Sequence, residues 1–522
     1  MNTRFVIKNA MIMDGSGRSA TGGDLSVENG KITAVGKSLP VTGFETIDAK
    51  GLVLSPGFID AHGHSDISLF AAPEAPGKIS QGITTEISGN CGLSVFPVTD
   101  RNREHLQELY KQYNVKINWR NVDDYAEEMD RIKPAVNISS LCGHNTLRAA
   151  VMGYDEAVAT DGQVSEMSEY LRDSLENGAV GFSTGFLYIP GKFADRREVV
   201  GLLKALSSSS KPYTTHLRSE GDFLLESLDE TISASIEAGN RKIHVSHLKT
   251  AGNDNWHKID DTFLRISQAQ EKGLHVTADR YPYIESMTQL SAFLPSPYNK
   301  MDDIKLKNFL KEGRNFRKFL SDLKLLPEER WKTLRLISTS ANFAKPGFGK
   351  TFSDYGKEIG MDPAELCSKI LREDTTGATA ASAGMCEENL KKIISQDFVS
   401  CGSDETSRPL DYSLGRSHPR GFGSMPRFIN YLKPAMLLEK IISKMTSLPA
   451  QIFNFYDRGL LAPGYAADLV LWNPDTLADT ANFAEPHSLS KGIMKVWVNG
   501  VLSYEEGMMT GKRAGKYLVC RD

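Results

Sequence analysis

Short apolar runs and helical segments alternate through the middle of the chain. In the helical segments, such as Val164 to Asn177, apolar residues recur at the spacing of one helix face. The apolar runs have the length of strands. They cover residues 53–61, 83–89, 135–141, 179–184, 213–217, 242–247, 274–279 and 397–403. Alternating strands and helices predict a parallel sheet, and eight such units predict a (β/α)8 TIM-type barrel of the α/β class.

The two ends of the chain show another pattern, in which short β-type runs are separated by turn residues. Near the start, Asp14-Gly15 and Asn29-Gly30 separate such runs, and near the end Asn499-Gly500 lies inside a predicted hairpin. We therefore expect one small β domain built from residues 1–54 and 455–522. The barrel lies between them, at about 55–430.

A long gap separates the seventh predicted strand, 274–279, from the eighth, 397–403. A normal crossover needs far fewer residues, so the gap predicts an insertion, which we place at about 290–345. A helical, lysine-rich part from Lys305 to Leu326 lies within it. The insertion is either a lid over an active site or a passive surface excursion, and both interpretations stay open.

Composition narrows the class of protein. The chain of 522 residues has 40% hydrophobic and 24% charged residues, as soluble globular proteins do. Its net charge of −4 gives no reason to expect binding to nucleic acid or to an anionic membrane. No apolar run reaches the length of a transmembrane helix, and the first residues lack the apolar core of a signal peptide. The six cysteines form no CxxC pair, so we expect a reducing, cytoplasmic location.

Zinc ligands stand at the ends of five of the eight predicted strands. His62 and His64 are two residues apart after the first strand, so their imidazoles are expected to point to the same side. The other strand ends carry a cysteine, two single histidines and an aspartate, namely Cys91, His216, His247 and Asp404. Barrel enzymes keep their chemistry at this end of the strands, and these side chains are ligands of Zn²⁺. Their gathering at one end of a barrel predicts a zinc site.

This order of ligands resembles the amidohydrolase superfamily. Most dinuclear members of that superfamily bridge their metals with a carboxylated lysine on strand four, where this chain has no lysine at 179–185. Instead it has Gly-Asn-Cys-Gly at 89–92 after strand two, which is similar to the D-aminoacylase, or N-acyl-D-amino-acid deacylase, family. Further matches are Gly-Phe-Ser-Thr-Gly at 181–185, Ser-His-Leu-Lys at 246–249, Tyr-Pro-Tyr at 281–283 and His-Pro-Arg at 418–420.

The resemblance implies a zinc-dependent amide hydrolase that removes the acyl group from N-acyl-D-amino acids with a metal-activated water. It implies one tight zinc held by Cys91, His216 and His247. A second, weaker metal site uses the remaining ligands, His62, His64 and Asp404, with Cys91 open as a bridging ligand. Asp404 would also take a proton from the water and pass it to the leaving amine.

The substrate implied by the resemblance is a small N-acyl-D-amino acid whose carboxylate pairs with Arg420. The other expected contacts are Tyr188, Lys249, Tyr281 and Ser286. Lys249 has two open roles. It could pair with an acidic side chain of the substrate, or it could join Arg420 at the α-carboxylate and leave an apolar pocket. Of the two, we expect neutral substrate side chains. One departure bears on the substrate range. The family has Ser-Asp-Gly followed closely by proline, whereas this chain has Ser-Asp-Glu-Thr-Ser-Arg-Pro at 403–409.

Three other functions stay open at this point. A dipeptidase for dipeptides with a C-terminal D-amino acid would use the same chemistry. A cyclic-amide hydrolase such as a hydantoinase is disfavoured by the missing bridging lysine. A non-catalytic scaffold would not need the five histidine and cysteine ligands and Asp404.

Overall fold

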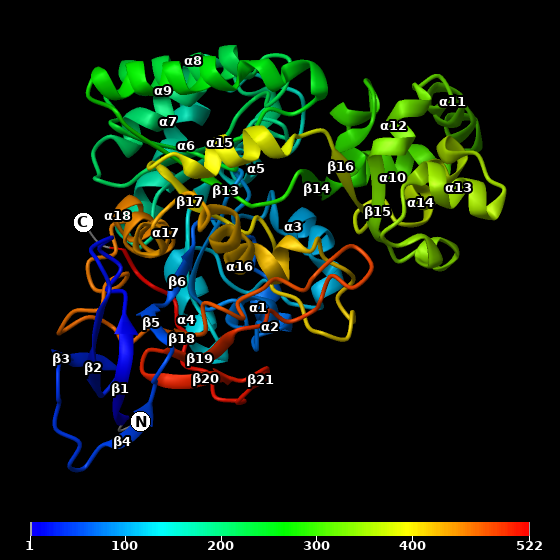
Figure 1. Ribbon diagram of the computed structural model, residues 1–522. Helices are drawn as coiled ribbons and strands as arrows, with labels where there is room; N and C mark the ends of the chain where they lie inside the picture. Colours follow the sequence, from blue (N-terminus) through cyan, green and yellow to red (C-terminus); the bar gives the residue numbers. More distant parts are fainter. Residues whose placement is uncertain (1–2, 521–522) are drawn as a thin grey trace.

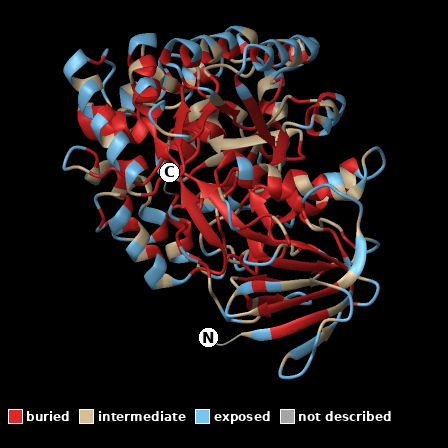
Figure 2. Ribbon diagram, turned by 90° about the vertical axis from the view of Figure 1, so that its left-hand side faces the viewer, coloured by how far each residue is buried: buried red, intermediate tan, exposed pale blue. Residues whose placement is uncertain are grey.

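The computed structural model describes residues 3–520 as a barrel, a small β domain and a lobe inserted into the barrel (Figure 1). In Figure 1 the lobe, in green to yellow-green, lies to one side of the barrel, and the small domain, in blue and red, lies below the barrel. Buried residues concentrate in the strands, whereas the outer helix faces are exposed (Figure 2). Within residues 3–520 no helix is both long and apolar enough to span a bilayer.

Eight parallel strands form the barrel, and the third of them is interrupted. They are β6 (Phe58–Asp60), β7 (Ile83–Ser88), β8 (Asn137–Ser140) with β9 (Cys142–Gly143), β10 (Phe182–Gly185), β11 (Tyr213–His216), β12 (Lys242–Val245), β13 (His275–Arg280) and β17 (Val399–Cys401). Their order is β6-β7-β8 and then β9-β10-β11-β12-β13-β17. At the interruption, the amide of Leu141 still donates to the Ser88 carbonyl at 2.9 Å.

Backbone hydrogen bonds close the barrel between its last and first strands. Just beyond β6, the amide of Ala61 donates to the carbonyl of Cys401 at 3.2 Å. The amide of Asp404 donates to the carbonyl of His62 at 2.7 Å. These bonds bring together the ends of the first and eighth strands, and with them two of the predicted ligand positions. The predicted (β/α)8 barrel is confirmed.

The prediction of one strand over 53–61 is wrong, because strands of two different sheets meet there. β5 (Val53–Pro56) belongs to the small domain, and β6 begins the barrel after Gly57. A Cβ at Gly57 would lie 2.0 Å from Oγ1 of Thr84. Only glycine therefore fits where the chain passes from one sheet to the other. A continuous apolar run does not show such a change of sheet.

Helices surround the barrel, and several of them have well-defined ends. At the start of the helix 161–176, Thr160 accepts from the amide of Gln163 while the Gln163 side chain accepts from the amide of Thr160, which satisfies two free donors. The barrel helices are α1 (Ser68–Ala71), α2 (Pro76–Ile79), α3 (Arg103–Leu109), α4 (Val122–Ile132), α5 (His144–Met152), α6 (Asp161–Glu176), α7 (Arg196–Leu206), α8 (Leu224–Ala238), α9 (Ile259–Glu271), α15 (Glu387–Ser395), α16 (Arg420–Leu432), α17 (Leu438–Met445) and α18 (Ser447–Ile452).

Both ends of the chain build the small β domain, as predicted. Besides β5, its strands are β1 (Arg4–Ile12), β2 (Thr21–Glu28), β3 (Lys31–Gly36), β4 (Glu45–Asp48), β18 (Leu469–Trp472), β19 (Ile493–Val498), β20 (Val501–Glu505) and β21 (Met508–Met509). β5 is the joint, since it pairs with β1 on one side and with β18 on the other. The rings of Phe5 and Trp497 stack with centroids 5.5 Å apart, so side-chain packing also joins the two ends.

The inserted lobe is longer than the predicted 290–345. Its antiparallel sheet, in the order β14-β16-β15, consists of β14 (Glu285–Gln289), β15 (Leu334–Ser338) and β16 (Thr379–Ala383). Its helices are α10 (Asp303–Lys311), α11 (Gly313–Leu323), α12 (Glu328–Thr333), α13 (Phe352–Ile359) and α14 (Pro363–Glu373). The lobe has a hydrophobic core of its own, which includes Phe319 and Trp331. It runs from about 285 to 383, because β14 and β16 belong to the lobe rather than to the barrel.

Candidate metal centre and active site

The predicted ligands lie at or just beyond the last residues of β6, β7, β11, β12 and β17, at the C-terminal end of the barrel. Three of them have a left-handed backbone, with φ of 55° at Cys91, 36° at His247 and 51° at Asp404. Residues with a Cβ rarely adopt this conformation, because the Cβ crowds the carbonyl oxygen. Such strain concentrates at functional sites, where the surrounding structure holds it in place.

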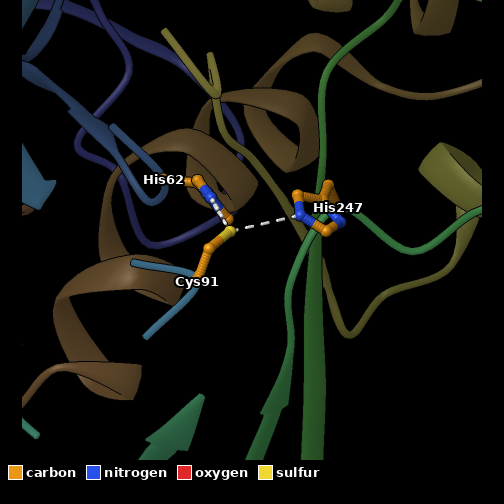
Figure 3. Close-up of side chains that lie close together, drawn as sticks. All are labelled: His62, Cys91 and His247. Carbon is orange, nitrogen blue, oxygen red and sulfur yellow. Dashed lines mark hydrogen bonds between the residues drawn. The ribbon is translucent and has the colours of Figure 1, made fainter. Parts of the chain in front are cut away.

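Cys91 lies between two imidazoles that come from different strands (Figure 3). Its Sγ is 3.4 Å from Nε2 of His62 and 3.4 Å from Nε2 of His247, and all three side chains are buried. Burial raises the pKa of the Cys91 thiol, but His62 and His247 together lower that pKa well below its ordinary value. A thiolate with two imidazole nitrogens is a donor set for zinc. The residues present therefore fit the predicted ion.

His216 adjoins this cluster through His247. The two rings have centroids 4.5 Å apart, and the ligand atoms of His216, Glu220 and His247 lie within 4.8 Å of one another. Glu220 was not predicted. Its Oε1 is 2.8 Å from Nδ1 of His247 and also forms an ion pair with Lys249. A partner on Nδ1 leaves Nε2 of His247 directed at Cys91.

A second group of ligand atoms shares His62 with the first. Oδ1 of Asp404 is 3.2 Å from Nε2 of His64 and 3.6 Å from Nε2 of His62, and Oδ2 is 2.9 Å from Nη1 of Arg420. Burial raises the pKa of the Asp404 carboxyl, but Arg420 and then His64 lower that pKa well below its ordinary value. Burial lowers the pKa of His64, and the hydrogen bond to Asp404 raises it to about 9. Asp404 is therefore ionised at neutral pH.

Asp279, near the end of β13, is a second carboxylate that sequence reasoning missed. Its Oδ2 is 3.1 Å from Nδ1 of His62 and 3.0 Å from Nε2 of His244, and its Oδ1 accepts from the backbone amide of His247 at 3.0 Å. Asp279 thus orients the ring of His62 and holds the backbone of His247. Carboxylates commonly accept a hydrogen bond from metal-binding histidines in this way. Its position in the sequence could have identified it, because Asp279 is the last residue of the predicted strand 274–279 and so falls at the end of the barrel where the ligands are expected.

A cavity of about 290 Å³ opens between the end of the barrel and the lobe. Its lining includes His64, Cys91 and Asp404 from the barrel and residues 287–289 of β14 from the lobe. The lobe therefore forms one wall of the candidate active site rather than lying away from it.

Two of the five predicted substrate contacts, Tyr188 and Arg420, line this cavity. The Tyr188 hydroxyl is 3.2 Å from Oγ1 of Thr288 on β14. Tyr281 is buried against Arg420, whose guanidinium carbon lies 4.6 Å from the ring centre. In the described chain the Tyr281 hydroxyl has no hydrogen-bond partner, so it keeps a donor free next to Arg420.

The structure does not bring Lys249 or Ser286 to the cavity lining. Lys249 forms an ion pair with Glu220, and its Nζ is 2.8 Å from Nδ1 of His247. Ser286 pairs with Ser382 in the sheet of the lobe, one residue from the lining residue Met287.

Several known proteins are similar to this chain. The amidohydrolase family matches residues 45–200 and 359–504. An N-acyl-D-aspartate deacylase and a D-aminoacylase, both from Alcaligenes xylosoxydans xylosoxydans, are 32% and 31% identical over 99% of this chain and over 95% and 97% of their own. The N-acyl-D-glutamate deacylase of Bordetella bronchiseptica, solved with zinc and a phosphonate inhibitor, is 30% identical, with a TM-score of 0.82 and 100% of both chains covered. A D-aminoacylase with a binuclear metal centre is 29% identical, with a TM-score of 0.81 and 99% of both chains covered.

Proposed function

Because the chain belongs to the amidohydrolase family, among the N-acyl-D-amino-acid deacylases, we propose that it is a zinc-dependent hydrolase that removes the acyl group from N-acyl-D-amino acids. The resemblance inferred from the order of its ligands is confirmed. The observation that carries the proposal is the cluster in which His62 belongs both to a buried group with Cys91 and His247 and to a partly buried group with His64 and Asp404.

Cys91, His216 and His247 are the proposed ligands of the tighter zinc, and His62, His64 and Asp404 those of a weaker second site. A zinc ion bound by these residues would polarise the substrate carbonyl as a Lewis acid and would lower the pKa of a bound water toward 7. Asp279 on Nδ1 of His62 and Glu220 on Nδ1 of His247 hold these two rings with Nε2 free for the metal.

Asp404 is the proposed general base and acid. An ionised carboxylate beside His62 and His64 can accept a proton from the attacking water and return it to the leaving amine nitrogen. Arg420 holds one of its oxygens at 2.9 Å. A substrate carboxylate that pairs with Arg420 competes with that ion pair and leaves Asp404 freer to accept the proton.

Arg420 is the proposed partner of the α-carboxylate. It is 2% exposed and lines the cavity, and its buried Nε has no hydrogen-bond partner within residues 3–520. The free hydroxyl of Tyr281 and the side chain of Tyr188 are the proposed further contacts, together with Ser286, which is next to the lining residue Met287. For Lys249 we propose a positioning role, because Glu220 occupies its ammonium group.

A substrate panel with metal analysis tests this function. We expect N-acetyl-D-amino acids to be cleaved faster than their L enantiomers by protein that contains zinc. Faster cleavage of the L enantiomers across the panel would contradict the proposal. Cleavage of dipeptides with a D-terminal residue alone would replace it with the dipeptidase function. A reducing cytoplasm is the proposed location, because a thiolate ligand such as the one proposed at Cys91 persists where thiols are kept reduced.

A further inference from the structure

The wall of the cavity contains a second guanidinium group, and this one lacks a counterion. Arg408 lines the same cavity as Arg420 and is only 6% exposed. Arg420 has Asp404 at 2.9 Å, whereas no carboxylate oxygen of residues 3–520 lies within 4.0 Å of the Arg408 guanidinium nitrogens. The Nη1 group of Arg408 donates to the carbonyl of Leu414, and its Nε is buried without a partner.

An unpaired cation in this position is unfavourable for the folded protein. A guanidinium stays protonated in proteins, so Arg408 does not escape the cost of burial by losing its charge. A single backbone carbonyl replaces only part of the hydration that the cation loses. Residues that break a packing rule in this way concentrate at functional sites. The missing anion is therefore expected from a ligand.

The backbone holds Arg408 in place on both sides. The amide of Ser407 donates to Oγ of Ser65 at 2.8 Å and to Oγ of Ser68 at 3.0 Å, close to the start of α1. The carbonyl of Pro409 accepts from Nδ1 of His487 at 2.8 Å. A cation fixed in this way loses little freedom when it binds an anion. The same run, 403–409, is where the sequence departs from the family pattern.

The other cations near the site are already engaged. Lys249 is paired with Glu220, and Arg420 is the proposed partner of the α-carboxylate. We propose that Arg408 is a specificity-determining residue that binds a second carboxylate of the substrate, so that the enzyme prefers N-acyl-D-amino acids with two carboxylates. This inference rests on the proposed function. It replaces both the expectation of neutral side chains and the reading of Lys249 as the partner of an acidic side chain.

The second carboxylate can come from the side chain of the amino acid or from a dicarboxylic acyl group. Two matched pairs of substrates separate these sources. N-acetyl-D-glutamate is compared with its neutral isostere N-acetyl-D-glutamine, and N-succinyl-D-alanine with its terminal amide. For the wild-type enzyme we expect kcat/KM for the acid to exceed that for the amide in at least one pair by about 30-fold or more, the scale of a desolvated charge pair.

The variant Arg408→Met should remove this preference. We expect the ratio of acid to amide to fall to within about 3-fold, mainly because KM for the acid rises, while kcat/KM for the neutral amide stays close to that of the wild type. Arg408→Lys should keep part of the preference, since it keeps the charge but loses the bidentate geometry.

Arg416→Met is the matched control. Arg416 lies in the same segment, but its guanidinium donates to the carbonyl of Ala484 and stacks on Tyr412, and it does not line the cavity. It should keep the wild-type ratio.

Three outcomes would overturn the inference. A wild-type ratio near one in both pairs does so even if Arg408→Met fails to fold. Equal loss on acid and amide in a folded Arg408→Met would assign the residue a structural role. If the enzyme cleaves neither the acids nor the amides, the proposed function falls and this inference falls with it. The first two outcomes remove the inference alone and leave the proposed function in place.

Discussion

At the scale of single residues, the candidate site depends on carboxylates that spacing along the chain does not single out. The proposed metal ligands could be named from the sequence because each lies at or just beyond the end of a predicted strand, and Asp279 could have been named for the same reason. Glu220 could not. It lies four residues after His216, beyond β11, where no periodic pattern places its side chain. Only the fold shows that its Oε1 is 2.8 Å from Nδ1 of His247.

Cys91→Ala should lose most of the tightly bound zinc, because it removes the proposed thiolate ligand. Cys142→Ala is the matched control. Cys142 is also buried in the barrel, but burial raises the pKa of its thiol to about 12, so it stays a neutral thiol. Elemental analysis of the two purified variants measures the difference. Equal zinc content in both would show that Cys91 is not a ligand.

Asp404→Asn should keep the tight zinc and lower kcat by at least ~10²-fold, the usual scale of general acid–base catalysis. The amide retains the shape of the side chain but accepts no proton near neutral pH. Turnover and metal content are measured on the same preparation, so that loss of metal is not mistaken for loss of the base. Turnover close to that of the wild type would remove Asp404 from the proposed mechanism.

At the scale of elements, a strand could be predicted where its own residues show an apolar pattern. A strand that lacks such a pattern, and forms only because neighbouring strands pair with it, could not. β16 consists of small residues, Thr-Ala-Ala-Ser-Ala, with no apolar alternation. It is a strand because β14 and β15 pair with it from both sides, and strand preference depends on such neighbours. The bounds of the lobe were therefore missed, although the gap between the seventh and eighth strands indicated that an insertion exists.

The helix α17 carries a buried lysine whose charge should make stability depend on pH. Lys444 is 2% exposed, and its Nζ donates to the carbonyl of Gln396. Burial lowers the pKa of Lys444 from 10.5 to about 7, although Asp397 partly opposes this. Between these values the unfolded chain binds more protons than the folded one, so the contribution of this group to stability rises with pH. Below about pH 7 Lys444 is charged in the folded protein, so the unfavourable free energy of burying its ammonium group acts in full.

Lys444→Met should therefore stabilise the protein at low pH. Methionine fills similar space without a charge, and we expect the free energy of unfolding at pH 6 to rise by a few kcal/mol, with the gain shrinking toward pH 9. Lys440→Met is the control on the same helix. Lys440 is 47% exposed and pairs with Asp397, so its loss should matter little at either pH. Unfolding curves at the two pH values provide the measurement. A pH-independent effect of Lys444→Met would contradict the assigned cause.

At the scale of the whole molecule, the sequence predicted the architecture because each part has its own pattern. The barrel shows alternating strands and helices, and the small domain shows turn-separated runs at both ends of the chain. The order of strands in the small domain could not be predicted from these patterns. β1 pairs in parallel with both β4 and β5, and nothing in the periodicity of a strand states which neighbour it will have.

Zinc should stabilise the whole molecule, because its proposed ligands follow five different barrel strands. An ion that binds only the folded state adds about 2.7 kcal/mol when its free concentration is 100 times its Kd. For a chain of 522 residues this corresponds to a rise in Tm of about 2–3 °C.

Removal of zinc with a chelator should therefore lower the Tm of the wild type by that amount, measured by calorimetry at one scan rate. Cys91→Ala is the control for this experiment. If Cys91 holds the metal, the chelator should leave the Tm of the variant unchanged, because there is no tight zinc to remove. An equal shift in both proteins would show that the chelator acts on another site. No shift in the wild type would mean that the ends of β6, β7, β11, β12 and β17 are not linked by a tightly bound ion.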